Sequence, residues 1–468
     1  MIRLHETIVV ERPLADCYRY LVDFSTSEQW DPGVYRARKV TPGEPDVGSR
    51  FELVLNSASR RVPMSYRLTH LEPGRSIRLF GEGEGFSADD TINFSAISPQ
   101  QTEIDYVAEL RFSGPAARVE PFLRGWLQRM GRKALAGMHS ALTPPREAPV
   151  QSRRQALAHA LVLPAMPSFT ERGYLQMPDK GLTERLDGKR FAITGPTSGL
   201  GLAAACELSR LGARLVLVGR DSERLQEAKQ AVLDFSGAPA ATVDILEAEL
   251  SLVSEAARAG KILRQRYARL DGLINNAGAL FGEREVTSEG HERALALLLL
   301  VPYVLTEAVL PSLKAASGHV INVSSGGMYT QPLKLDDMEF EQEKYDGAKA
   351  YARAKRALVA VTEYWAKTHP TVRFNSMHPG WAAMPGVAKS LPKFNQLLNK
   401  RLRDSRMGAD TIVWLASASC LEGITGKFWF DRRPRATALL PGTAVSASQR
   451  DQLVAWLKRT CSGSSGSA

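Results

Sequence analysis

A tyrosine followed four residues later by a lysine occurs twice in one short stretch, KYDGAKAYARAK, which spans residues 344–355. The pairs are Tyr345 with Lys349 and Tyr351 with Lys355. Residues four apart on a helix lie on nearly the same face, so each pair could place a phenol beside an ammonium group. A carbonyl that accepts hydride develops negative charge on its oxygen and needs a proton donor there. A tyrosine beside a lysine suits that task, because the ammonium favours the phenolate and lowers the tyrosine pKa from about 10.

The two tyrosines cannot both serve one site, because successive helical residues are about 100° apart and these two would face different ways. We favour Tyr351 with Lys355, since the segment after Lys355, RALVAVTEYWAKTHP, has the pattern of an amphipathic helix. Asp346-Gly347 beside Tyr345 is typical of a turn. Tyr345 is then expected to line the entrance of the pocket or to be a partly buried loop tyrosine.

A glycine-rich turn, TGPTSGLG, places Gly195, Gly199 and Gly201 between a predicted strand, RFAIT, and a predicted helix, AAACELSRLG. Such glycines let the backbone approach a pyrophosphate, and the N-terminus of the helix offers free N–H groups. A second predicted strand, RLVLVGR, follows in order. We therefore predict a dinucleotide site in a doubly wound parallel sheet, a Rossmann fold. The turn residues expected to bind the cofactor are Gly195, Thr197, Ser198, Gly199, Leu200 and Gly201.

The end of the second predicted strand indicates which cofactor is bound. An NAD site needs a carboxylate near this point for the ribose 2′-hydroxyl, whereas an arginine suits a 2′-phosphate. Here Gly219 ends the strand and Arg220 follows. The sequence therefore favours NADP, and NAD is the weaker alternative. Arg220 could also be a solvated residue ahead of Asp221, which could cap the next helix.

Two further stretches complete an ordered set of motifs: NNAG at residues 275–278 and VINVSSGG at residues 320–327. With the glycine turn and YxxxK, this set resembles the short-chain dehydrogenase/reductase superfamily from about residue 186 to about residue 427. SSGGM, YDGAKAYARAKR, SMHPGWA and GKFWFDRRP are similar to the branch called dehydrogenase/reductase SDR family member 12. The resemblance adds no substrate.

The resemblance implies roles for individual residues. Tyr351 would donate the proton, Lys355 would hold the nicotinamide ribose, and Ser325 would bond the substrate oxygen. Ser324 is the alternative serine. Besides the turn residues, Arg220, Tyr351 and Lys355, the expected cofactor-binding residues are Glu249, Leu250, Asn276, Ala277, Gly278, Pro379 and Gly380.

Three positions depart from the superfamily pattern. Leu298 stands where many members have an asparagine that supports a proton relay to the lysine, and leucine cannot hydrogen-bond. Met384 replaces a threonine that contacts the nicotinamide amide, and Glu249 replaces an aspartate that faces the adenine. The first two motivate a rival hypothesis, in which the chain is a non-enzymatic carrier of lipophilic ligands or an NADPH-sensing protein.

Residues 1–145 follow a different pattern, in which short alternating segments end in one long helical segment, residues 115–142. The predicted strands are HETIVVERP, RFELVLNS, MSYRLTHLE, SIRLFGEG, TINFSAIS and TEIDYVAELRFSG. With PLADCYRYLVDF and SEQWDPGV, this layout resembles the START/polyketide-cyclase-like superfamily, also called SRPBCC. That resemblance implies an α+β helix-grip fold, in which an antiparallel sheet holds a long helix around a cavity for a lipophilic ligand. A packed core without a ligand is the alternative.

The predicted organisation therefore has four parts: a first domain at 1–145, a linker at 146–186, a Rossmann domain at 187–460 and a flexible tail at 461–468. The linker segment QSRRQALAHALVLPAM could form an amphipathic helix. Packing on a neighbouring domain is a more economical explanation of that helix than membrane docking.

The composition limits the function classes. The chain has 468 residues and a formal net charge of +10, but its Lys and Arg are scattered, which argues against nucleic acid. None of the four cysteines forms a CxxC pair, so we predict no metal site and a reducing, cytoplasmic compartment. The apolar run at residues 294–305 is too short to span a bilayer and is expected to be a buried helix.

We therefore expect an NADP-dependent oxidoreductase that reduces a carbonyl, or oxidises a secondary alcohol, on a lipophilic substrate. The resemblance to short-chain dehydrogenases also suggests a homo-oligomer.

Overall fold

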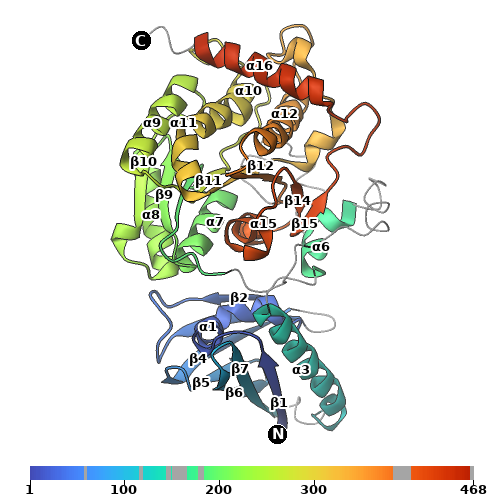
Figure 1. Cartoon of the computed structure of the whole chain (residues 1–468). Coiled ribbons are helices and arrows are strands. Elements are labelled where there is room, and N and C mark those ends of the chain that lie inside the picture. Colours follow the sequence, from blue (N-terminus) through green and yellow to red (C-terminus); the bar gives the residue numbers. More distant parts are fainter. Residues whose placement is uncertain are drawn as a thin grey trace. The chain divides into compact units, whose positions relative to one another are not determined.

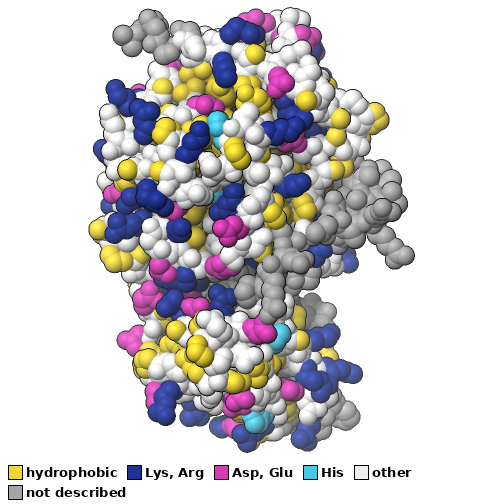
Figure 2. Space-filling model, in the orientation of Figure 1, with side chains coloured by type: hydrophobic (Ala, Val, Ile, Leu, Met, Phe, Trp, Pro, Cys, Tyr) yellow, Lys and Arg dark blue, Asp and Glu magenta, His cyan; other side chains and the backbone are white. Residues whose placement is uncertain are grey.

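The computed structural model describes residues 1–56, 61–114, 120–143, 149, 166–177, 184–382 and 402–463. The chain divides into two compact units (Figure 1). The first unit is Met1–Arg146 with Met177–Leu182, and the second is Glu147–Gln176 with Thr183–Ala468. The described Lys and Arg side chains are interspersed with Asp and Glu on the face shown in Figure 2.

The first unit is an antiparallel sheet in the order β1-β7-β6-β5-β4-β3-β2. A long helix, α3 (Glu120–Leu142), packs against β1. The side chains of Ala134, Met138 and Leu142 are buried against the sheet. This is the α+β helix-grip fold that the resemblance to the START/polyketide-cyclase-like superfamily implied. The strands are β1 (Ile2–Val10), β2 (Val34–Lys39), β3 (Arg50–Asn56), β4 (Arg61–Glu72), β5 (Ser76–Gly83), β6 (Phe86–Ser98) and β7 (Gln101–Phe112).

Two strands differ most from the sequence prediction, and β1 and β4 each begin three residues earlier than predicted. The sequence analysis missed β2, whose alternation is interrupted by a register shift between Val34 and Arg36. It also began β6 too late, at Thr91, because the two aspartates before it are unfavourable in strands. In the structure, Asp89 pairs with Arg78, and Asp90 accepts a hydrogen bond from the Tyr106 hydroxyl, so both are accommodated in the sheet.

Three short helical segments join the strands of the first unit: α1 (Leu14–Val22), η1 (Phe24–Thr26) and α2 (Ser27–Trp30). They lie in the segments PLADCYRYLVDF and SEQWDPGV. The first half of α3 does not bury its whole predicted apolar stripe, since Trp126 is 42% exposed. Trp126, Leu127 and Met130 instead border a cavity in this unit.

The second unit is a mostly parallel sheet in the order β10-β9-β8-β11-β12-β13-β14-β15, with only the final pair antiparallel. Its strands are β8 (Arg190–Thr194), β9 (Arg214–Gly219), β10 (Val243–Glu247), β11 (Gly272–Asn275), β12 (His319–Val323), β13 (Arg373–Met377), β14 (Phe428–Phe430) and β15 (Arg433–Arg435). The first three strands are added outward from β8 to β10, and the later strands are added on the other side of β8, beginning with β11. The order of the strands therefore switches sides between β8 and β11. In doubly wound folds, ligands bind at such a switch point, beyond the carboxyl ends of the strands.

Helices cover both faces of this sheet, and two separate hydrophobic cores lie between them and the strands. The core on one face is formed with α9 (Val253–Arg266), α11 (Val301–Ala316), α12 (Gly347–Thr368) and α16 (Ala447–Gly463). The core on the other face is formed with α7 (Gly199–Arg210), α8 (Ser222–Ser236) and α15 (Ser405–Ser417). The doubly wound Rossmann prediction is therefore confirmed.

The apolar run at residues 294–305 belongs to a longer helical stretch, Arg293–Ala316. By length and composition alone this stretch could cross a membrane, but 72% of its most apolar window is buried inside the protein. It consists of α10 (Arg293–Leu295), a π-helical segment η5 (Ala296–Leu300) and α11. The prediction of a buried helix agrees with this arrangement, although the helix is longer than the apolar run suggested.

Part of the predicted linker is integral to the second unit. The segments η3 (Met166–Phe169) and α6 (Glu171–Leu175) pack within it. Most of the predicted amphipathic helix at 151–166 lies outside the described residues. At the other end, α16 continues to Gly463, so the start of the predicted flexible tail is helical.

Candidate active site

The glycine turn follows β8 and leads into α7, as the sequence predicted. Gly195 has a φ of +64°, a conformation that favours glycine. A Cβ on Gly201 would lie 2.2 Å from the carbonyl oxygen of Gly195. The Asn276 side chain closes the turn, since its Nδ2 donates to the carbonyl oxygens of Thr194 and Gly195 at 2.9 and 3.1 Å. The glycines therefore allow a close backbone approach that any larger residue would prevent.

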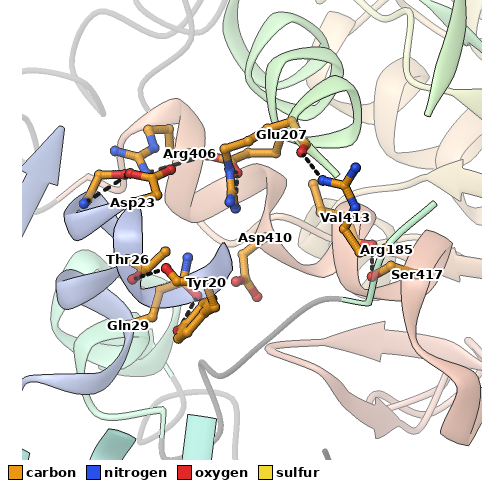
Figure 3. A network of polar contacts seen from close by, with 12 residues as sticks. Tyr20, Asp23, Thr26, Gln29, Arg185, Glu207, Arg406, Asp410, Val413 and Ser417 are labelled. Carbon is orange, nitrogen blue, oxygen red and sulfur yellow. Dashed lines mark hydrogen bonds and ion pairs between the residues drawn. The ribbon is translucent and has the colours of Figure 1, made fainter. Parts of the chain in front are cut away.

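Helix α7 is fixed to α15 by charge. Glu207 on α7 lies 3.5 Å from Arg406 on α15, and Figure 3 shows the two side chains facing each other. Glu207 also accepts from Arg210, one turn later, at 2.8 Å. Burial alone would raise the pKa of Glu207, but the two arginines hold it below its usual value. The carboxylate is thus kept ionised, and the pairs orient the helix whose N-terminus faces the cavity.

A cavity of about 550 Å³ lies at the carboxyl ends of the strands. Its size is within the range of small-molecule sites. The structure brings every predicted site residue to this one cavity. These residues are Gly195, Thr197, Ser198, Gly199, Leu200, Gly201, Arg220, Glu249, Leu250, Asn276, Ala277, Gly278, Ser325, Tyr351, Lys355, Pro379 and Gly380.

The two candidate serines differ in their partners. Ser324 is 2% exposed, and its Oγ donates to the Lys355 carbonyl oxygen at 3.2 Å. Ser325 begins a short 3-10 helix, η6 (Gly326–Thr330), and its Oγ accepts from the Gly327 N–H at 3.1 Å. The Ser325 side chain also acts on Tyr351 and lowers its pKa. The geometry therefore favours Ser325 as the serine that meets a substrate.

The structure also separates the two tyrosines. Asp346 caps α12 by accepting from the Lys349 N–H at 3.0 Å, and Tyr351 lies in the second turn of that helix. Tyr345 precedes the helix, and its hydroxyl donates to Glu292 Oε1 at 3.0 Å. Tyr345 is a partly buried loop residue, which was one of its two expected positions, and it is not among the described residues that line the cavity.

Lys355 is 3% exposed and points toward the same site. Its Nζ donates to the Val323 carbonyl oxygen at 2.6 Å and lies 5.8 Å from the centre of the Tyr351 ring. Burial lowers the pKa of Lys355 to about 7. We expected Lys355 to lower the tyrosine pKa, but burial raises the pKa of Tyr351, and only the effect of the Ser325 side chain opposes this. The expectation was wrong for this structure, because the desolvated lysine loses much of its own charge near neutral pH.

Comparison with known proteins identifies this arrangement. Residues 189–394 match the family described as short chain dehydrogenase. Dehydrogenase/reductase SDR family member 12 of Bos taurus is 39% identical over 294 residues, which cover 61% of this chain and 92% of that protein. The chain belongs to the short-chain dehydrogenase/reductase family. The Homo sapiens relative of the same name is 37% identical over 273 residues, 58% of this chain and 85% of the relative. Retinol dehydrogenase 14 of Mus musculus is 32% identical over 274 residues, 54% of this chain and 80% of the relative.

The first unit has its own match. Residues 1–143 match the family described as polyketide cyclase / dehydrase and lipid transport. The chain therefore joins a START/SRPBCC-type domain to a short-chain dehydrogenase domain. Membership of the dehydrogenase family makes it an oxidoreductase of carbonyl or alcohol groups that uses a nicotinamide dinucleotide.

One departure from the family pattern lies deep in the site. Leu298 is fully buried in η5, among Ala294, Phe340, Ala350 and Ala354. A Cβ on Gly278 would lie 3.2 Å from Leu298 Cδ2 and 3.7 Å from Lys355 Nζ, so both side chains border the same space. Leu298 thus places a methyl group where many family members have an amide. Met384, the second departure, lies outside the described residues.

The adenosine end of the cavity carries two arginines. Arg220 follows β9, and Arg224 lies in the first turn of α8. Asp221 caps α8 by accepting from the Arg224 N–H at 3.1 Å. Both interpretations of this stretch therefore hold: Asp221 caps the helix, and Arg220 borders the cavity. The sequence analysis missed Arg224, although its place in the first turn after a predicted helix cap was a usable signal.

The loop after β13 is held by the connector segment. Gly380 has a φ of +75°, and its neighbour Trp381 donates its N–H to the Phe169 carbonyl oxygen at 2.8 Å. The Phe169 ring lies 5.1 Å from the His378 ring and 5.7 Å from the Trp381 ring. Arg403, which is 1% exposed, pairs with Asp431 at 2.6 Å and donates to the Phe169 carbonyl oxygen at 3.1 Å. Sequence reasoning found neither Phe169 nor Arg403, because both act through contacts between distant segments.

Proposed function

We propose that this chain is an NADP-dependent oxidoreductase that reduces a carbonyl, or oxidises a secondary alcohol, on a lipophilic substrate. The observation that carries the proposal is the meeting of Ser325, Tyr351 and Lys355 in one cavity with the glycine turn. Leu298 motivated the rival carrier hypothesis, but a complete proton-donating set has no evident use in a protein that only binds.

Tyr351, Ser325 and Lys355 have separate roles in this reaction. The nicotinamide, when bound, supplies or accepts the hydride. In the reducing direction, Tyr351 donates its hydroxyl proton to the substrate oxygen, while Ser325 donates a hydrogen bond to that oxygen. Lys355 lies beside the tyrosine ring and is anchored on the Val323 carbonyl oxygen, so it orients the site and can return a proton to it.

The preference for NADP rests on the charges at the adenosine end. Gly219 stands where an NAD site would carry a carboxylate, and Arg220 and Arg224 both border this part of the cavity. Two guanidinium groups suit a 2′-phosphate, which they can bind through charge-assisted hydrogen bonds.

The preference for a lipophilic substrate rests on the cavity walls and on the first domain. Beyond Tyr351 the dehydrogenase cavity is bordered by Leu280, Phe281, Leu297 and Trp381. A relative of this chain is named for retinol, an apolar alcohol. The first domain contains a separate cavity of about 560 Å³, and we propose that it binds a lipophilic molecule and presents it for reaction.

A titration of the purified chain with NADPH and with NADH, followed by cofactor fluorescence, tests the proposal. We expect NADPH to bind at least tenfold more tightly than NADH. Turnover of NADPH with apolar ketones and aldehydes should then appear in the wild type and be lost in Tyr351→Phe, which still binds NADPH. Tighter binding of NADH would overturn the cofactor assignment. NADPH binding without turnover of any apolar or polar carbonyl would favour the carrier hypothesis.

A further inference from the structure

The cavity of the first domain is apolar along most of its wall. It lies between the inner face of the sheet and α3, and aromatic rings from several elements face it, including Phe24, Trp30 and Trp126. Its volume of about 560 Å³ is sufficient for a ligand with ten to twenty non-hydrogen atoms, roughly the range of small-molecule sites.

One polar cluster interrupts this apolar wall. Asp90 on β6 is 2% exposed, and its Oδ1 accepts from the Tyr106 hydroxyl at 3.1 Å. The Tyr66 hydroxyl also interacts with this carboxyl group. The second oxygen, Oδ2, has no hydrogen-bond partner among the residues that the structure describes. A buried carboxyl oxygen without a partner is costly, so a ligand group that donates to it would be favoured.

A second carboxyl group faces the same space. Asp31 follows α2, and its Oδ1 accepts from the Gly33 N–H at 2.7 Å. It is near enough to Asp90 that its charge raises the Asp90 pKa. Glu6 on β1 is a third acidic residue of the lining, and the described lining residues include no Lys, Arg or His. An anionic ligand such as a fatty acid would place its carboxylate beside these groups without a compensating cation.

We propose that this cavity binds an apolar molecule that carries a protonated amine, with the ammonium group paired to Asp90 and Asp31. The inference rests on the proposed function, in that it assumes that the first domain takes up an apolar molecule. The ammonium would donate to the Asp90 oxygen that has no partner, and charge-assisted bonds of this kind are among the strong ones. The rings of Trp30, Tyr66 and Tyr106 would add cation–π attraction.

Three ligands of equal chain length test the ammonium group directly. Decylamine, decanol and decanoate, each below its micellar concentration, are titrated calorimetrically into the full chain. We expect decylamine to bind at least tenfold more tightly than decanol, and decanoate to bind most weakly. In Asp90→Asn the tenfold preference should vanish while decanol binding stays within about twofold, which shows that the cavity is intact. Asp31→Asn provides a second variant and should lower the preference in the same direction.

The matched control is Asp89→Asn on the same strand. Asp89 points to the opposite face of the sheet and pairs with Arg78 at 2.7 Å, so this variant should keep the full amine preference. Binding of decylamine no tighter than decanol would overturn the amine inference while leaving an apolar ligand in place. If none of the three compounds bound, the lipophilic role of the first domain would fail as well. An amine preference that survived in both Asp90→Asn and Asp31→Asn would place the amine elsewhere and overturn the inference.

Discussion

The Arg220 guanidinium lies 3.8 Å from the Glu249 carboxylate at the adenosine end of the cavity. Both side chains are more than a third exposed, so this pair contributes little to stability. It does, however, hold Arg220 over the cavity by a weak contact that a phosphate could replace.

Replacing Arg220 should weaken the binding of NADPH more than the binding of NADH. Arg220→Ala removes a charge-assisted contact to the 2′-phosphate, so we expect NADPH binding to weaken about tenfold or more. Binding of NADH should change less than twofold. Fluorescence titration with both cofactors measures the difference. Arg214→Ala, at the opposite and exposed end of β9, is the matched control and should affect neither. Equal losses for both cofactors would show that Arg220 supports the fold and not the phosphate.

The two tyrosines allow a second matched comparison. Tyr351→Phe removes the proton donor, so kcat should fall about 10²- to 10⁴-fold with little change in NADPH affinity. Tyr345→Phe removes only a hydrogen bond to Glu292, which should cost about 1 kcal/mol of stability and leave kcat nearly unchanged. Steady-state kinetics and thermal unfolding on the same preparations check both results. If Tyr345→Phe were the variant without turnover, our choice between the pairs would be wrong.

Because Lys355 is buried, its contribution to the free energy of unfolding should depend on pH. Its pKa is about 7 in the folded protein and about 10.4 when unfolded. Between these values the unfolded chain binds more protons, so this lysine costs most stability below pH 7 and progressively less as the pH rises toward 10. Lys355→Met should therefore raise Tm relative to wild type more at pH 6 than at pH 9. The exposed Lys349→Met should show no such trend. A constant difference across this range would mean that Lys355 is not desolvated.

Asp90 should make the first domain less stable as the pH rises. Burial raises its pKa to about 7, whereas an unfolded aspartate titrates near 3.9. The stability that it contributes is therefore complete below about pH 4 and is lost as the pH passes through 7. The groups that face it are Tyr66, Tyr106 and Asp31, and the charge of Asp89, on the opposite face of the sheet, raises its pKa further. Hydrogen exchange measures the amide protection of β6 peptides in the wild type and in Asp90→Asn. Between pH 5 and 8, protection in the wild type should fall relative to protection in the variant. Protection that stayed constant or rose in the wild type relative to Asp90→Asn over this range would contradict this.

Phe169 should influence the cofactor site from the connector segment. Its ring packs on His378, Trp381 and Phe430, so Phe169→Ala removes packing behind the loop that carries Gly380. We expect a loss of up to about 3 kcal/mol of stability and weaker NADPH binding with kcat less affected. Tyr174→Phe, in the same segment, removes a hydroxyl that donates to Asp410 at 3.3 Å and is the control. Unchanged NADPH affinity in a folded Phe169→Ala protein would show that the connector does not position the loop.

Much of the site follows from local sequence. The glycine turn, NNAG, the paired serines and YxxxK each owe their positions to a strand end or a helix start, and such boundaries leave signals in neighbouring residues. The choice of Tyr351 over Tyr345 also rested on local signals, namely the turn residues Asp346-Gly347 and the amphipathic pattern after Lys355. The turn glycines, Asn276, Gly278, both serines, Tyr351 and Lys355 line one cavity because the carboxyl ends of parallel strands meet at one edge of a sheet.

The sequence by itself determined the two fold classes, the order of the motifs and the residue types at the dehydrogenase site. Only the tertiary structure decided the charge state of Lys355, because desolvation depends on everything packed around the group and not on its neighbours in the chain. The same holds for Phe169 and Arg403, which brace the cofactor loop from segments more than 200 residues apart. It also holds for Asp90, which lies in β6 although aspartate is unfavourable in strands. Its place in an apolar cavity arises only because residues of five other strands, β1–β4 and β7, and of α3 line the same space.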